Sequence, residues 1–143
     1  MIEIVQDLPL NVGQARAYAG VSQPELLDQW WTLNSRGHPE VGALYDLDFG
    51  PQYRWRARVT RAVPSVAFEL EMTEVDADWR GTTIGFQLEP QGSGTLLHFH
   101  HRGWREASAH YRTTNHCWAL YLRVLRRHLE LGETVPYLDR LLC

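Results

Sequence analysis

Three histidines lie close together in the segment TLLHFHH, residues 95–101, where they could bind a metal ion or move a proton. His98 and His100 are two residues apart, so on a β-strand their side chains point to the same face. Two imidazoles alone make an incomplete zinc site, because such sites use three or four protein ligands. We therefore expect no metal at these two residues.

His101 is the residue best suited to proton chemistry. Alternation along the strand places it on the opposite face from its two neighbours, at a strand end beside Gly103 and Trp104. An imidazole with an ordinary pKa of about 6.5 can act as a general acid or base, or hydrogen-bond a ligand. No acidic residue is placed by the sequence to orient its second nitrogen, as a working base requires. The favoured interpretation is a histidine hydrogen-bonded within the structure, which leaves the catalytic residues unknown.

The acidic run EVDADW, residues 74–79, offers oxygen ligands of the kind that calcium prefers. It lacks the glycine and the closing glutamate of a calcium-binding loop. The chain also has no nucleophile elbow, no phosphate-binding glycine loop and no Cys-x-x-Cys pair. We expect neither a metal nor a cofactor.

The charge of the chain narrows the classes of partner. Its 143 residues carry a net charge of -3, which gives no general attraction to nucleic acid or to an anionic membrane. All 14 basic residues are arginine, so lysine Schiff-base chemistry is excluded. We expect one domain, residues 1–143, that binds no nucleic acid.

The location of the protein follows from its hydropathy and its cysteines. No apolar run approaches the roughly 20 residues of a membrane-spanning helix, so we expect no membrane insertion. The first residues, MIEIVQDLPL, lack the basic cluster of a secretory signal. Cys117 and Cys143 form no disulfide framework and are expected to be free thiols in a reducing cytoplasm.

Five segments with hydrophobic period two would position these residues. Their alternation predicts an antiparallel meander with one face on a core and one in water. Residues 2–9 predict a further strand, so the sheet should have about six. On the outer face Arg54, Arg56 and Arg58 have acidic neighbours on both adjoining strands, which favours cross-strand pairing over nucleic-acid binding. The five segments are ALYDLDF (43–49), YRWRARV (53–59), VAFELEMT (66–73), TTIGFQLE (82–89) and TLLHFHH (95–101).

Helical patterns flank the meander. Residues 12–20 predict a short helix after an Asn11 cap, and Ser22 with Glu25 forms a capping-box pattern that should start a second helix through residue 31. After Gly103 an apolar stripe with 4-3-4 spacing predicts a helix of about 25 residues that ends at Gly132. The stripe consists of Trp118, Leu122, Leu125 and Leu129, extended backwards through Tyr111 and Asn115.

The order of these segments and their residue sequences resemble the activator-of-Hsp90-ATPase-homologue-like branch of the START/Bet v 1-like (SRPBCC) superfamily. The similar segments are LNVGQARAYAGVSQPELLDQWW (10–31), Val41-Gly42-Ala43, GTLLHFHHRGW (94–104) and WALYLRVLRRHLELGETVP (118–136). Tyr18 departs from the pattern, since relatives often carry tryptophan there. The resemblance implies an α+β helix-grip fold, in which a curved antiparallel sheet surrounds a long C-terminal helix, with two short helices after the first strand. It also implies a cavity between sheet and helix.

Inward-pointing aromatic residues and three tyrosine hydroxyls that need partners support a cavity. The residues expected to line it are Trp30, Tyr45, Tyr53, Trp55, Phe68, Phe86, Phe99, His101, Tyr111, Asn115 and Trp118.

Three functions fit this interpretation. The leading hypothesis is a non-enzymatic protein that binds or carries a small apolar or aromatic molecule. The second is an enzyme like the polyketide cyclases and dehydratases, with His101 and Tyr45, Tyr53 or Tyr111 handling protons. The third is a protein-interaction module like the co-chaperone relatives. A second copy of the chain, forming a homodimer, is a further candidate partner.

Overall fold

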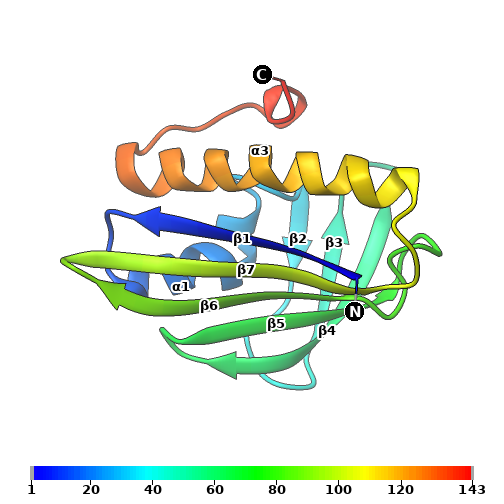
Figure 1. The fold of residues 1–143 in the computed structure, drawn as a ribbon, viewed down its shortest axis with the longest axis horizontal. Coiled ribbons are helices and arrows are strands. Elements are labelled where there is room, and N and C mark those ends of the chain that lie inside the picture. The colour runs from blue at the N-terminus through cyan, green and yellow to red at the C-terminus, as the bar shows by residue number, and fades with distance from the viewer. Residues whose placement is uncertain (1, 143) are drawn as a thin grey trace.

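Seven strands form one antiparallel sheet within residues 2–142, the part of the chain that the computed structural model describes (Figure 1). Across the sheet the order is β1-β7-β6-β5-β4-β3-β2, so the first strand closes against the last one. The predicted meander and the helix-grip fold are confirmed. The strands are β1 (Ile2–Leu10), β2 (Asn34–Arg36), β3 (Leu44–Asp48), β4 (Arg54–Val63), β5 (Ala67–Glu74), β6 (Thr83–Gln91) and β7 (Gly94–Trp104).

The strand that the sequence did not predict is β2. It consists of three residues, NSR, and pairs with β3 in the register Asn34 to Asp48. A segment this short shows no hydrophobic alternation, and only its pairing with β3 makes it a strand. The estimate of about six strands was therefore one too low.

Two short helices follow β1, as predicted, but they begin and end at other residues. The first, α1 (Gln14–Ser22), begins after Gly13, and α2 (Pro24–Leu27) begins after Gln23 and does not reach residue 31. The capping-box interpretation of Ser22 is wrong, because this residue is the last of α1 and its hydroxyl donates to the Tyr18 carbonyl at 2.6 Å. The chain between these helices turns on Gln23 instead.

The long helix α3 (Ala109–Leu131) packs against β1 and runs along it (Figure 1). The Ser108 hydroxyl caps its first turn by accepting from the Tyr111 amide at 3.2 Å. Gly132 ends it in the left-handed conformation, with φ 70°, as the sequence predicts. None of the helices within residues 2–142 is long and apolar enough to cross a membrane.

The buried stripe of α3 follows the predicted positions in its C-terminal half but not in its first turns. Trp118 is buried, and one helical turn before it the buried residue is Thr114. Asn115 is exposed, and its carbonyl accepts from the Gln6 side chain at 3.3 Å. Asn115 lies three residues before Trp118 and Thr114 lies four before it. With 3.6 residues per turn either position could continue the stripe, and the packing of α3 buries Thr114.

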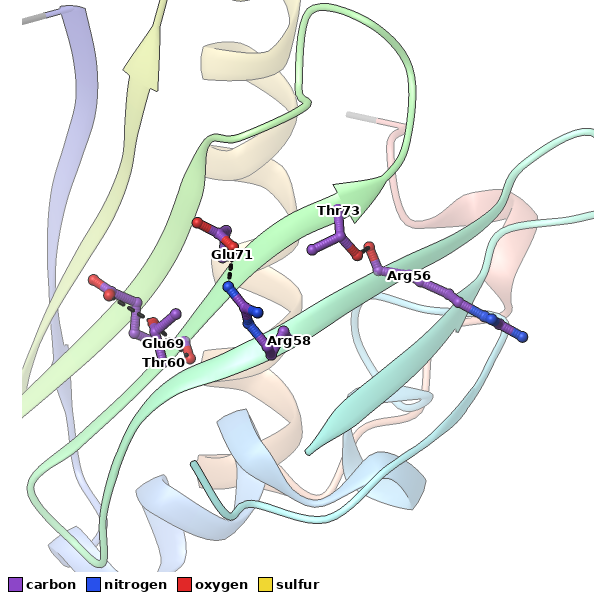
Figure 2. Close-up of polar contacts among 6 residues, drawn as sticks. All are labelled: Arg56, Arg58, Thr60, Glu69, Glu71 and Thr73. Carbon is purple, nitrogen blue, oxygen red and sulfur yellow. Dashed lines mark hydrogen bonds and ion pairs between the residues drawn. The ribbon is translucent and has the colours of Figure 1, made fainter. Parts of the chain in front are cut away.

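The outer face of the sheet carries the expected cross-strand pairs (Figure 2). The Arg58 guanidinium lies 2.8 Å from the Glu71 carboxylate on β5, and the Thr60 hydroxyl donates to Glu69 at 2.8 Å. Arg56 bonds Asp46 on β3 at 3.0 Å. These exposed ion pairs are worth at most about 1 kcal/mol each, and they pair two of the three arginines of β4, Arg56 and Arg58, with acids.

His98 and His100 lie on this outer face and are bonded to carboxylates. The two ring nitrogens of His98 lie 2.7 Å from Asp7 and 3.1 Å from Glu89, while Nε2 of His100 lies 2.9 Å from Glu69. The two acids flank opposite sides of the His98 ring, so they cannot converge on one metal ion. No group of three metal-binding side chains occurs among residues 2–142.

Replacing His98 by glutamine should weaken the pH dependence of stability. The hydrogen bond to Asp7, and then that to Glu89, raises the pKa of His98 above its ordinary value. The contribution of His98 to the free energy of unfolding is therefore complete below the pKa of the unfolded state, about 6.5. It is lost as the pH rises through the higher pKa of the folded state. Urea unfolding across this range should show wild type losing more stability than His98→Gln, by less than about 1 kcal/mol because the site is exposed. His116→Gln, at an exposed position of α3, is the control; equal pH profiles for all three proteins would contradict the prediction.

Candidate functional site

A cavity of about 290 Å³ opens between α3, the turn joining β3 to β4, the turn joining β5 to β6, and the C-terminal segment. Aromatic side chains border it on the sheet side and on α3, and α3 adds smaller polar side chains. Its lining residues are Trp31, Phe49, Tyr53, Trp55, Trp79, His110, Thr113, Thr114, Cys117, Trp118, Tyr121, Tyr137 and Leu141.

The aromatic wall is a connected series of rings. Phe49 lies 5.4 Å from Trp31 and 5.4 Å from Trp55, measured between ring centroids. Trp55 in turn lies 4.8 Å from Trp79, which stacks on Trp118 at 6.4 Å with an interplanar angle of 24°. Edge-to-face and offset stacks of this kind each add roughly 0.5–1.5 kcal/mol beyond burial. The wall is therefore held in shape before any ligand enters.

The helical wall carries polar side chains on one face of α3. His110, Thr114, Cys117 and Tyr121 are spaced three or four residues apart, so their side chains follow one another along the helix. Burial raises the pKa of the Cys117 thiol and of the Tyr121 hydroxyl, so both stay protonated near neutral pH. The hydroxyls of Thr114 and Tyr121 bond no other group within residues 2–142, which leaves them available to a ligand.

The C-terminal segment closes one side of the cavity. After α3 it turns back along the helix to the short 3-10 helix η1 (Tyr137–Asp139) (Figure 1). The Tyr137 hydroxyl donates to the Phe49 carbonyl at 3.1 Å. The buried Arg140 guanidinium donates to the carbonyls of Thr32 at 3.1 Å and Asp28 at 2.6 Å. The Arg140 contacts join this segment to the residues after α2, and the Tyr137 contact joins it to the turn after β3.

His101 lies behind the aromatic wall rather than in the cavity. It is 0% exposed, and the Trp118 indole N–H donates to its Nδ1 at 3.1 Å. Nδ1 therefore carries no proton, and Nε2–H donates to the Thr82 hydroxyl at 2.8 Å. The Thr82 hydroxyl in turn donates to the Trp79 carbonyl at 2.6 Å, which extends the hydrogen-bond network to the β5–β6 turn.

This network removes His101 from proton chemistry. Burial lowers its pKa to about 3, so the ring is neutral near pH 7. Both ring nitrogens are bonded to protein groups, and neither faces the cavity lining. Its role is to fix the two tryptophans that bound the cavity, Trp118 through a direct bond and Trp79 through Thr82.

Of the side chains predicted to line a cavity, Tyr53, Trp55 and Trp118 lie in its wall. Tyr111 and Asn115 lie elsewhere on α3, and the Tyr111 hydroxyl donates to the Glu3 carbonyl at 2.8 Å. The others are packed in the core at 1% exposure or less: Trp30, Tyr45, Phe68, Phe86, Phe99 and His101.

Two of these core residues, Tyr45 and Trp30, have their polar tips bonded to the backbone. The Tyr45 hydroxyl donates to the Ser22 carbonyl at 2.6 Å, and the Trp30 indole N–H donates to the Gly20 carbonyl at 2.9 Å. The tyrosine hydroxyl that seemed to need a ligand or water therefore finds its partner at the end of α1.

The predicted set omits most of the lining residues, which come from three sources. The α3 residues carried a signal, since positions 110, 114, 117 and 121 form a second stripe beside the apolar one. Trp79 lies in a turn, and Tyr137 and Leu141 follow the end of α3, where no periodicity indicates a direction. Trp31 and Phe49 fall at the ends of a predicted helix and a predicted strand, and neither is among the residues predicted to line a cavity.

Replacing Thr82 by valine should destabilise the fold. The change keeps the shape of the side chain but leaves the buried Nε2–H of His101 without an acceptor, at a cost of roughly 1–3 kcal/mol. Thr83→Val is the matched control, since Thr83 is the next residue and lies on the other face of β6. Urea unfolding measures the stability of both variants. Equal stabilities would contradict the role of Thr82 as hydrogen-bond partner of His101.

The Activator of Hsp90 ATPase homolog 1-like protein family model matches residues 11–130. Among solved structures, the Aha1 dimer from Colwellia psychrerythraea is similar with 26% identity and a TM-score of 0.84, over 93% of this chain and 99% of that one. The protein SSP2350 from Staphylococcus saprophyticus has 17% identity and a TM-score of 0.77, over 94% and 96% of the two chains.

CalU16 from Micromonospora echinospora, at 14% identity and a TM-score of 0.73 over 91% of this chain and 77% of its own, shares the fold. No curated protein sequence matches the chain. The family model extends from the residues just before α1 almost to the end of α3, and so includes most of the elements around the cavity. The protein therefore belongs to the Activator of Hsp90 ATPase homolog 1-like family, a branch of the START/Bet v 1-like superfamily.

Proposed function

We propose that the protein binds a small, neutral aromatic molecule in the cavity beside α3, and carries or sequesters it without chemical change. The observation that carries this proposal is the convergence of Trp31, Trp55, Trp79 and Trp118 on one cavity, to which α3 also contributes polar side chains. Small-molecule sites generally have this composition, with mostly apolar and aromatic walls and a few placed polar groups.

The size of the cavity suggests two aromatic rings. An apolar cavity of about 150 Å³ holds one benzene molecule. The cavity here measures about 290 Å³, close to the lower end of typical ligand sites. A bicyclic aromatic molecule fits this volume, and a long lipid chain does not.

The charge of the cavity supports a neutral ligand. No aspartate, glutamate or arginine belongs to the described lining. An ionised ligand would leave water without a partner of opposite charge, which costs several kcal/mol. A neutral aromatic ligand gains from the same burial.

The cyclase-like alternative receives no comparable support. It needs His101 and a tyrosine hydroxyl in one cavity, but both nitrogens of His101 are bonded to Thr82 and Trp118. The hydroxyls of Tyr45 and Tyr111 donate to backbone carbonyls. Binding without chemistry is therefore the function that we adopt.

Naphthalene, a bicyclic probe, should shift the indole N–H signals of four tryptophans in a nitrogen-15 NMR titration. Those are the tryptophans of the cavity wall, where the ring current of a bound aromatic molecule acts directly. Trp30 is an internal control, because it stacks behind Trp31 outside the cavity lining and its N–H is bonded to Gly20, so its signal should shift less. Equal shifts for Trp30 and the four wall residues, or no shifts, would count against the site.

Filling the cavity should abolish this binding. Cys117→Phe places a ring in the space, and we expect the affinity for naphthalene to fall by about tenfold or more, equivalent to about 1.4 kcal/mol. His116→Phe introduces the same side chain at the preceding, exposed position of α3 and should leave the affinity unchanged. Similar affinities for the two variants would place the ligand outside the cavity.

We also propose that the protein forms a homodimer in the cytoplasm. Leu138 is 85% exposed and Leu142 66%, and exposed leucines in one short segment favour association with another apolar surface. A second copy is the partner that we choose, because the similar structure from Colwellia psychrerythraea is described as a dimer. A free thiol at Cys117 is consistent with a reducing compartment.

Sedimentation velocity should detect a dimer that Leu138→Asp converts to monomer. The aspartate would bring a charge into the apolar contact, which is unfavourable without a partner. Val63→Asp, at an exposed position near the end of β4, is the control and should stay dimeric. A wild-type protein that is monomeric at all concentrations would refute the proposal.

A further inference from the structure

His110 is the one titratable imidazole in the wall of the cavity, among the residues that the structure describes. It lies in the first turn of α3, and its Nδ1 is 3.1 Å from a carboxylate oxygen of Asp78 in the β5–β6 turn. Its ring stacks on Trp79 at 6.3 Å with an interplanar angle of 27° and meets the edge of Trp104 at 6.0 Å. A carboxylate and two indoles thus hold the ring in one orientation.

The contact with Asp78 selects one tautomer of His110. An ionised carboxylate only accepts hydrogen bonds, so Nδ1 carries the proton. In the neutral ring Nε2 is then unprotonated and presents a lone pair. No group within residues 2–142 bonds Nε2, and the side chain, which is 37% exposed, borders a largely aromatic cavity, so this acceptor is left unused there.

A lone pair of this kind distinguishes among aromatic ligands. It accepts from a phenolic hydroxyl, which is a good hydrogen-bond donor. It gains nothing from an unsubstituted ring, and it repels the oxygens of a carboxylate. The hydroxyls of Thr114 and Tyr121 on the same face of α3 can donate or accept, so they add hydrogen bonds but do not discriminate in this way.

We propose that the ligand class is hydroxylated bicyclic aromatic molecules, whose hydroxyl donates to Nε2 of His110 while Asp78 acts as the positioning residue. This inference rests on the proposed function, since it assigns the polar end of the same cavity. The rings lie between the tryptophans, and the hydroxyl points toward the first turn of α3.

Equilibrium dialysis of 2-naphthol, naphthalene and 2-naphthoate at about pH 8, where imidazoles are mostly neutral, tests the proposal. The measured quantity is the ratio of affinities for 2-naphthol and naphthalene. His110→Phe should lower this ratio by roughly fivefold, which is the worth of one ordinary hydrogen bond, while naphthalene still binds. His116→Phe, on the exposed side of α3, should keep the wild-type ratio.

The role of Asp78 has a spectroscopic signature. Nitrogen-15 chemical shifts of the His110 ring should report an unprotonated Nε2 in the wild-type protein and a mixture of tautomers in Asp78→Asn. Asp78→Glu should restore both the single tautomer and part of the preference for 2-naphthol. A merely structural role for Asp78 would leave the tautomer unchanged.

The outcomes separate this inference from the proposed function. If naphthalene binds and His110→Phe leaves the ratio unchanged, or if 2-naphthoate binds more tightly than 2-naphthol, the hydroxyl-reading role is wrong and the aromatic site stands. If neither naphthalene nor 2-naphthol binds the wild-type protein, the proposed function fails and this inference fails with it.

Discussion

Trp118 occupies the junction on which the rest of this structure depends. Its ring is 1% exposed and lies between α3 and the sheet, with centroid distances of 4.5 Å to Phe99 and 5.2 Å to Trp31. The other buried apolar residues of α3 lie beyond Trp118 along the helix and pack in the core. The cavity lies on the other side of the Trp118 ring. Because an indole carries an N–H that must be bonded when buried, Trp118 also requires an acceptor inside the core. His101 provides that acceptor, and this requirement determines the tautomer of the histidine.

The histidines of this protein have different roles because their surroundings differ. His101 is buried and neutral and supports the aromatic wall from behind. His98 lies between two acids on the outer face, where it contributes to the pairing of strands. Only His110 is both held by a carboxylate and open to the cavity. The groups that contact each imidazole therefore determine whether it can bind a ligand or transfer a proton.

The cavity is rigid on one side and covered by a short segment on the other. Packed rings from β4, α3 and the turns between strands form the rigid side, and such rings lose little conformational freedom when a ligand binds. The covering segment is the end of the chain, which is attached through polar contacts from Tyr137 and Arg140. Segments with few apolar contacts open at low free-energy cost, so entry and release of a ligand need not disturb the sheet.

The sequence by itself determined the order of the elements, the two faces of the sheet and the C-terminal half of the α3 stripe. These features depend on periods of two and of about 3.6 residues, which local covalent geometry imposes. It did not predict β2, which exists only through pairing with β3, nor the position of Thr114 in the first turns of α3. For the site, it predicted Tyr53, Trp55 and Trp118, since each lies on an inward face. Only the tertiary structure decided which inward aromatic residues border open space and which, like Tyr45 and Phe68, are packed in the core. It also brought Trp79, His110 and Tyr137 together from a turn, a helix and the chain end, because contacts between segments distant in sequence depend on how the sheet curves around α3.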